Sequence, residues 1–139
     1  MARAALAGAI AAVAWAAAEP ALGRLFAVRY SDVRLLGAVV TRSRAWPVAG
    51  LALHAANGAV FGSAFRRAGL RGPVAGVAAA ELENLALWPW MAAVDRFHPD
   101  RRSGAWPPLL LNRRVFAYEV ATHAIFGLVL GALLREEAR

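Results

Sequence analysis

Seven polar side chains interrupt the apolar segments of this chain, and their types could support proton transfer, ion binding or acid-base catalysis. They are His54, Asn57, Glu81, Glu83, Asn84, Glu119 and His123. Three pairs among them are separated by three or four positions, so in a helix the two members of each pair project from one face. The spacing therefore predicts a polar cluster of imidazoles and carboxyls inside a helical bundle.

This cluster supports two kinds of interpretation. One is functional: a proton relay, an ion site or a general acid-base pair, for which Glu81, Glu119, His54 and His123 are the candidate catalytic residues. The other is structural: hydrogen bonds between helices that set their packing, with the glutamates protonated and neutral. Glu119 and His123 could supply two metal ligands from one helix, but no second ligand motif accompanies them, so we expect no metal and no cofactor.

Our first expectation is a non-enzymatic membrane protein of undefined activity, in which the cluster serves helix packing, ion or proton binding, or docking of a partner. The alternative is a small intramembrane enzyme that acts on a lipid or isoprenoid by Glu/His acid-base chemistry. No phosphate-binding glycine loop or nucleophile elbow supports that alternative. Whether the chain is an enzyme is left open by its sequence.

The composition indicates what surrounds the cluster. Hydrophobic residues make up 60% of the 139 residues and the mean hydropathy is +0.46, which is more apolar than an ordinary soluble domain. A soluble bundle of this length could not bury so much apolar surface in one interior. Ionisable groups at membrane depth cost at least ~2.5 kcal/mol each and usually face the protein interior, so the cluster should point inward.

Four apolar stretches predict an all-α, polytopic membrane bundle with four transmembrane helices. The clearest stretch covers residues 45–65, which carry no formal charge and match the ~20 residues needed to cross a bilayer core. The predicted helices cover about 3–22, 46–66, 72–94 and 114–135. The first also resembles a signal peptide, with Arg3 before an Ala-rich run; we expect it to be retained, because the repeat described next needs it.

One segment of the chain is written twice. The pattern His54-Ala55-x-x-Gly58-x-Val60-x-Gly62-x-x-x-Arg66 recurs 69 residues later, and 7 of the 15 residues from position 52 to 66 are identical in the two copies. We therefore expect one membrane domain, 1–139, built from two helical hairpins of about 1–69 and 70–139. Each hairpin crosses the membrane twice, so the two form a parallel repeat. Glu81, Glu83 and Asn84 have no polar counterparts in the first hairpin.

Four glycines extend the faces that carry the two histidines. Gly58 and Gly62 follow His54 at steps of four, and Gly127 and Gly131 follow His123 in the same way. This GxxxG spacing lets another helix backbone approach closely, so it predicts helix packing. The Ala-rich first helix is the natural partner within the chain, and a second copy of the chain is the other.

The net charge of +7 comes from 16 Arg and no Lys. An Ala-rich, all-Arg chain is typical of a GC-rich bacterial genome, so we expect a multi-pass protein of the bacterial inner membrane. The arginines lie in loops, which favours membrane lipids as partners and argues against nucleic acid. A homo-oligomer or a partner membrane protein is a further expectation. Ten of the arginines lie in the two long linkers, so the positive-inside rule favours cytoplasmic linkers.

The two long linkers differ in their predicted structure. In the first, Ser31-Asp32 is a plausible N-cap for a short amphipathic helix over 33–41 that would lie on the membrane surface. The second, 95–113, contains Pro99, Pro107 and Pro108 and is predicted to be irregular.

A family resemblance follows from these motifs. Leu53-His54-x-x-x-Gly58-x-x-Phe61-Gly62 and Glu119-x-x-x-His123-x-x-Phe126-Gly127-x-x-x-Gly131 resemble the His- and Gly-bearing helices of YagU-like bacterial inner-membrane proteins. Trp15-x-x-x-Glu19-Pro20 is similar to a stretch that ends the first helix of that family. The resemblance covers about half of the chain and implies an inner-membrane location, with an association with acid tolerance that would suit buried His and Glu.

Overall fold

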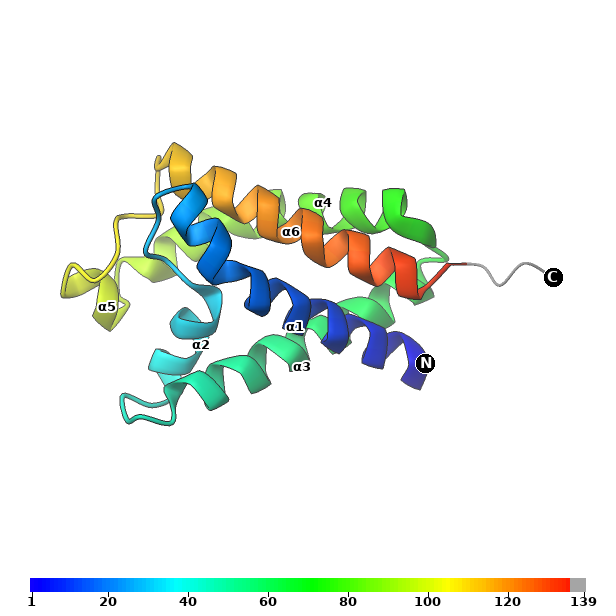
Figure 1. The fold of residues 1–139 in the computed structure, drawn as a ribbon, viewed down its shortest axis with the longest axis horizontal. Helices are drawn as coiled ribbons and strands as arrows, with labels where there is room; N and C mark the ends of the chain where they lie inside the picture. Colours follow the sequence, from blue (N-terminus) through cyan, green and yellow to red (C-terminus); the bar gives the residue numbers. More distant parts are fainter. Residues whose placement is uncertain (136–139) are drawn as a thin grey trace.

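The computed structural model describes residues 1–135, and every secondary-structure element in that part of the chain is a helix (Figure 1). The elements are α1 (Ala2–Leu25), α2 (Asp32–Val40), α3 (Trp46–Arg67), α4 (Gly72–Asp95), α5 (Pro99–Arg102) and α6 (Arg113–Leu133). The four helices predicted from the apolar stretches correspond to α1, α3, α4 and α6. Residues 136–139, the end of the second predicted hairpin, lie outside the described residues.

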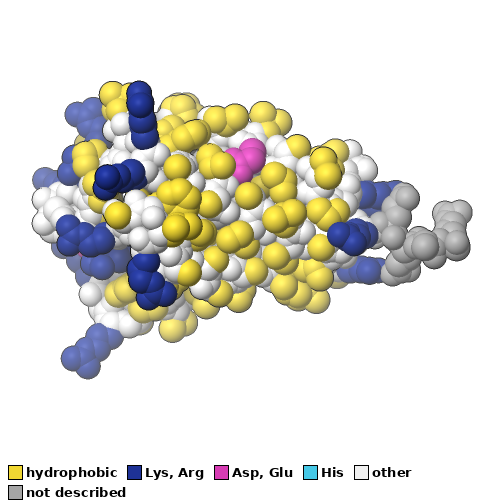
Figure 2. All heavy atoms as spheres, turned by 45° about the horizontal axis from the view of Figure 1, so that its top comes forward, with side chains coloured by type: hydrophobic (Ala, Val, Ile, Leu, Met, Phe, Trp, Pro, Cys, Tyr) yellow, Lys and Arg dark blue, Asp and Glu magenta, His cyan; other side chains and the backbone are white. Residues whose placement is uncertain are grey.

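Three of these helices, α1, α3 and α6, are long and apolar enough to cross a membrane. The fourth predicted span, α4, has the length but not the apolarity, because it carries the polar residues Glu81, Glu83 and Asn84. Large aliphatic side chains are exposed on the helices, among them Val48, Val60 and Val74. Figure 2 shows this apolar surface between arginines that gather at the two ends of the molecule. The fold is that of a helical membrane protein.

The long helices form a bundle that is closed on one side. α1 packs against α3 and α6, and α6 packs against α4. Within the described residues, no comparable packing joins α3 to α4. Figure 1 shows α1 and α4 running in one direction and α3 and α6 in the other, so the N-terminus and the end of α6 lie at one end of the bundle. We call this the terminal end, and the opposite end, with α2 and α5, the linker end.

Glycines bring the helices of each pair into backbone contact. A Cβ on Gly8 of α1 would collide with the carbonyl oxygen of Gly58 in α3, and one on Gly76 of α4 would collide with that of Gly127 in α6. Gly62 lies against Ala4 of α1 in the same way, and Gly131 against Gly72. The four glycines picked out in the sequence for helix packing thus lie at these two crossings.

Ser31 caps α2 as the sequence predicts, because its side chain accepts a hydrogen bond from the backbone N–H of Arg34. That this helix lies on the membrane surface stays a prediction. α2 packs against α3, where a Cβ on Gly37 would collide with the carbonyl oxygen of Trp46. The helix is folded back into the bundle, and its first residue, Asp32, is buried.

The second linker is irregular apart from the single turn of α5, in agreement with the prediction. Buried Asp95 fixes the position of this linker. Its carboxylate accepts hydrogen bonds from Trp106 Nε1 at 2.8 Å and from the backbone N–H of Leu109 at 3.2 Å. Asp100 joins it to α2 through a two-pronged ion pair with Arg34. The linker end is therefore a fixed structure.

Two apolar cores divide the bundle along its length. One, at the terminal end, contains small residues of α1 with Trp15, Phe65, Phe126 and Leu130. The other, at the linker end, contains Tyr30, Trp106, Leu109 and Tyr118. A group of buried polar residues that includes His54, Glu119 and His123 lies between these cores, next to Trp15 and Tyr30.

Candidate functional site

A cavity of about 120 Å³ lies between the two apolar cores. Its polar lining comes from four helices, α2, α3, α4 and α6, and from the residue two positions before α2: Tyr30, Asp32, His54, Asn57, Glu83, Asn84, Glu119 and His123. Asn57 and Leu87, on α3 and α4, are exposed and line the cavity as well. The cavity therefore opens sideways, in the gap where α3 and α4 do not pack.

His123 is the best-connected residue of the site. Its Nδ1 lies 2.7 Å from the backbone carbonyl oxygen of Glu119, one turn earlier in α6. A carbonyl only accepts, so Nδ1 carries a hydrogen and donates it. Nε2 then faces Glu83 Oε2 of α4 at 3.3 Å. A neutral imidazole has no hydrogen left for Nε2, so this contact is favourable when one proton is added, either to the imidazole or to the carboxyl.

Trp15 separates the two histidines of the repeat. The centroid of its ring lies 4.8 Å from that of His54 and 4.3 Å from that of His123. His54 Nε2 is buried without a hydrogen-bond partner among the described residues. The two imidazoles thus belong to one site and interact through an aromatic ring.

Glu119 and Asp32 form a pair of buried carboxyls. Glu119 is 4% exposed and Asp32 is 8% exposed, and both side chains line the same cavity. Each has one buried oxygen, Oε1 and Oδ2 respectively, without a hydrogen-bond partner in the described structure. Two carboxylates in one water-poor place repel each other, so a proton shared between them stabilises the pair.

A further chain of polar groups connects this pair to the linker end. The phenolic O–H of Tyr30 donates to Asp32 Oδ1 at 2.9 Å. Glu19 of α1 accepts from the hydroxyl of Ser31 and from the backbone N–H of Asp32. Burial, with the nearby Asp32 carboxylate as the second cause, raises the pKa of Tyr30 well above its usual range. Tyr30 therefore stays a neutral donor at ordinary pH.

The structure brings most of the predicted cluster together but changes one member's role. Glu83, not Glu81, contacts His123. Glu81 is absent from the cavity lining and instead accepts a long hydrogen bond from Asn84 Nδ2 at 3.4 Å. The reason is helical geometry, because residues two apart project from different faces of α4. Glu81 is therefore not among the residues that line the cavity with the two histidines, and Glu83 takes that place.

Four residues of this region were not among the predicted polar cluster: Trp15, Glu19, Tyr30 and Asp32. Glu19 is recognisable as a carboxyl inside an apolar helix, and Trp15 lies one turn before it. Tyr30 and Asp32 have no such signal, because they look like ordinary linker residues. They reach the site only because α2 folds back against α3.

The donor set favours protons over metals. Among the described residues, no group of three or more His, Asp or Glu side chains is arranged to hold a metal ion. The carboxyls and imidazoles instead meet in pairs, Glu83 with His123 and Asp32 with Glu119. Pairs of this kind bind and exchange protons.

Comparisons of the chain with protein-family models, curated proteins and solved structures find no match. The resemblance to YagU-like proteins, which these comparisons do not test, stays a prediction.

Proposed function

We propose that this protein binds and exchanges protons at a site buried at membrane depth, and that this is its function as a small multi-pass membrane protein. The contact between His123 Nε2 and Glu83 Oε2 carries the proposal. Nδ1 already donates its hydrogen to the carbonyl oxygen of Glu119. A hydrogen bond between Nε2 and Glu83 Oε2 therefore needs one added proton. Glu119 and Asp32 supply a second place where a proton stabilises two facing groups.

The size of the cavity supports protons as the species bound. About 120 Å³ holds about four water molecules, at roughly 30 Å³ each. Sites for small organic ligands have volumes of about 300–1,000 Å³. Water and protons fit the space between the carboxyls and imidazoles, and a lipid-sized substrate does not.

The proposed setting is a four-span bundle in the bacterial inner membrane. α3 and α6 run in the same direction (Figure 1), so if both cross the bilayer, the 24-residue α4 that leads from one towards the other must cross it back. The matching glycine crossings of α1 with α3 and of α4 with α6 support a parallel duplication of one helical pair. With the positive-inside rule, the linker end faces the cytoplasm.

In this setting, protons reach the site from one side. Glu19, Ser31 and Asp32 form the polar connection towards the linker end. Towards the terminal end, Trp15, Phe61 and Phe126 pack ring against ring over a core of alanines. An apolar, closely packed core excludes the water that would carry a proton further. The proposal is therefore a one-sided proton site and not a pore.

Nuclear magnetic resonance of the ring nitrogens tests the proposal, with ¹⁵N-histidine in the full-length protein in detergent micelles. We expect the signal of His123 Nε2 to show a hydrogen shared with Glu83, and Glu83→Gln to change this signal, because the substitution removes the carboxyl that lies 3.3 Å from Nε2. Glu81→Gln, two residues away on the same helix, is the matched control and should leave it unchanged. If the Nε2 signal shows no such hydrogen, or if the two variants behave alike, the proposal fails.

The sideways opening supports a second candidate. Asn57 and Glu83 lie where the cavity opens between α3 and α4, so a headgroup or a short polar part of a lipid or isoprenoid could reach Glu83 and His123 from the bilayer. In that case Glu83 and His123 would act as the acid-base pair. Turnover of a lipid or isoprenoid substrate that is lost in Glu83→Gln and kept in Glu81→Gln would favour this enzyme.

A further inference from the structure

A long apolar groove of about 920 Å³ runs along the bundle between α1 and the neighbouring helices α2 and α3. The apolar walls come from α1 on one side and from α2 and α3 on the other: Val13, Ala17, Pro20, Val33, Pro47 and Leu51. Val13 and Ala17 lie one turn apart, so the α1 wall continues from mid-helix to the linker end. This is the shape and lining that an extended hydrocarbon chain requires.

The groove exists because α1 and α3 meet at only one end. Gly8 and Gly58 bring their backbones into contact towards the terminal end. At the linker end α2 packs on α3, through Gly37, and thereby holds α1 and α3 apart. The wedge that remains is built by close backbone packing on both sides, so it is a fixed feature of the fold.

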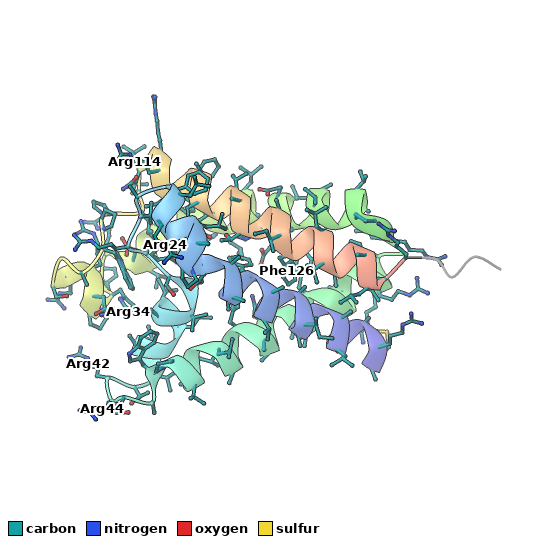
Figure 3. All side chains as sticks on the ribbon, in the orientation of Figure 1. Arg24, Arg34, Arg42, Arg44, Arg114 and Phe126 are labelled. Atoms are coloured by element: carbon teal, nitrogen blue, oxygen red, sulfur yellow. The ribbon has the colours of Figure 1, made fainter. Side chains whose placement is uncertain are left out.

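The linker end of the groove is basic. Arg24 and Arg29 line it together with Trp46, an aromatic residue of the kind enriched at the level of lipid headgroups. Among the described residues, no acidic side chain forms an ion pair with either arginine. Glu19 also lines the groove, but its carboxyl oxygens accept hydrogen bonds from Ser31 and from the backbone of α2. Figure 3 shows Arg24 beside the last turns of α1, apart from Arg42 and Arg44 on the loop before α3.

We propose that this groove is a binding site for one anionic phospholipid, with an acyl chain along α1 and the phosphate between Arg24 and Arg29. The apolar walls select a hydrocarbon chain, and two unpaired guanidinium groups at the headgroup level select a net negative charge. The groove shares Glu19, Tyr30 and Ser31 with the surroundings of the proposed proton site, but the lipid proposal does not depend on proton binding. It requires only that the protein lies in a bilayer.

Native mass spectrometry of the full-length protein tests the site, with phosphatidylglycerol and phosphatidylcholine of identical acyl chains as the two probes. We expect one phosphatidylglycerol to be retained in preference to phosphatidylcholine. The double variant Arg24→Gln/Arg29→Gln should weaken retention of phosphatidylglycerol about thirtyfold, from the loss of two charges near the headgroup. Arg42→Gln/Arg44→Gln, which removes two exposed arginines outside the groove lining, is the matched control and should retain it.

A steric variant makes the test independent of charge. Ala17→Trp places a large ring on the exposed α1 wall of the groove and should weaken retention of both lipids. Inorganic phosphate should not displace the bound lipid, since it offers no chain to the apolar walls. Equal loss in the two double-arginine variants, or retention unchanged in both Arg24→Gln/Arg29→Gln and Ala17→Trp, would overturn the proposal. If the double glutamine variant does not fold, Arg24→Gln alone is compared with Arg42→Gln by the same criterion.

Discussion

At the scale of single residues, the site depends on side chains whose partners come from distant parts of the sequence. Glu119 could be recognised from the sequence because a carboxyl one turn before a histidine in an apolar helix is conspicuous. Its partner Asp32 could not, since Ser31-Asp32 is also the ordinary start of a helix, and Ser31 does cap α2. Asp32 is buried because α2 packs against α3. The sequence of α2 alone does not predict that packing.

Replacement of Tyr30 by Phe tests whether Asp32 needs its phenolic donor. The O–H of Tyr30 donates to buried Asp32 Oδ1, so Tyr30→Phe leaves that oxygen without this donor and should cost about 1–3 kcal/mol of stability at neutral pH. Tyr118→Phe is a matched control, because the hydroxyl of Tyr118 is buried without a hydrogen-bond partner among the described residues. Thermal melts in detergent should show a clearly lower melting temperature for Tyr30→Phe than for Tyr118→Phe.

The pH dependence of the same variant follows from the raised pKa of Tyr30 in the folded protein. An unfolded tyrosine ionises near pH 10. A group whose pKa is higher in the folded protein than in the unfolded chain stabilises the fold fully at pH values below its unfolded pKa, here about 10. That stabilisation is lost as the pH rises through the folded pKa. The stability difference between the wild type and Tyr30→Phe should therefore narrow above about pH 10. A difference that widens with alkaline pH would contradict the buried, neutral phenol.

At the scale of helices, the apolar stretches predicted the four long helices, and the glycine spacing predicted which of their faces pack. The sequence-predicted helices at about 46–66 and 72–94 agree with α3 and α4 to within one residue at each end. The sequence was less informative about which residues these glycines contact on the neighbouring helix. Gly8 and Gly76, at equivalent places in the two crossings, are 68 residues apart, whereas Gly58 and Gly127 are 69 apart. A one-residue difference between the repeats is invisible in Ala-rich helices, where small residues occupy every face.

A bulky residue at one of these crossings should separate the helices. In α4, Gly76→Leu would drive a side chain into the backbone of α6 at Gly127, and overpacking of this kind costs typically ~1–3 kcal/mol or more. Ala78→Leu, on the same helix but at an exposed position, is the control and should change little. Thermal melts of the detergent-solubilised proteins measure both. Equal melting temperatures for the two variants would show that the α4–α6 crossing does not depend on the glycine.

At the scale of the whole molecule, the bundle departs from the symmetry that its repeated sequence suggests. If α1 corresponds to α4 and α3 to α6, the contact of α1 with α6 should be matched by one of α3 with α4. The first contact is present and the second is not, and the cavity opens in the gap. The residues that have no polar counterparts in the first hairpin, Glu83 and Asn84, lie at this gap. The residues that make α4 differ in sequence from α1 therefore lie at the candidate site.

The last prediction concerns transport across the whole protein. Trp15 lines the cavity on its terminal side. Behind it, Trp15 packs on Phe126 and Phe126 on Phe61, and the core around these rings is apolar. Liposomes that contain the wild-type protein and a pH-sensitive dye should therefore hold a pH gradient as long as protein-free liposomes do. A gradient that the wild type dissipates would mean that protons pass the aromatic rings, and the one-sided site would have to be abandoned.

Variants of two phenylalanines in α6 sharpen this measurement. Figure 3 shows Phe126 in the middle of the bundle, where it is 5% exposed. Phe126→Ser removes a ring from the seal and supplies the space and the polar group that a water molecule needs, so it should accelerate decay of the gradient. Phe116→Ser removes a ring that packs edge-on against Trp88, nearer the linker end of the same helix, and should leave the decay rate unchanged. If only Phe126→Ser accelerates the decay, the barrier to protons lies at the aromatic rings of Trp15, Phe61 and Phe126, on the terminal side of the His/Glu site.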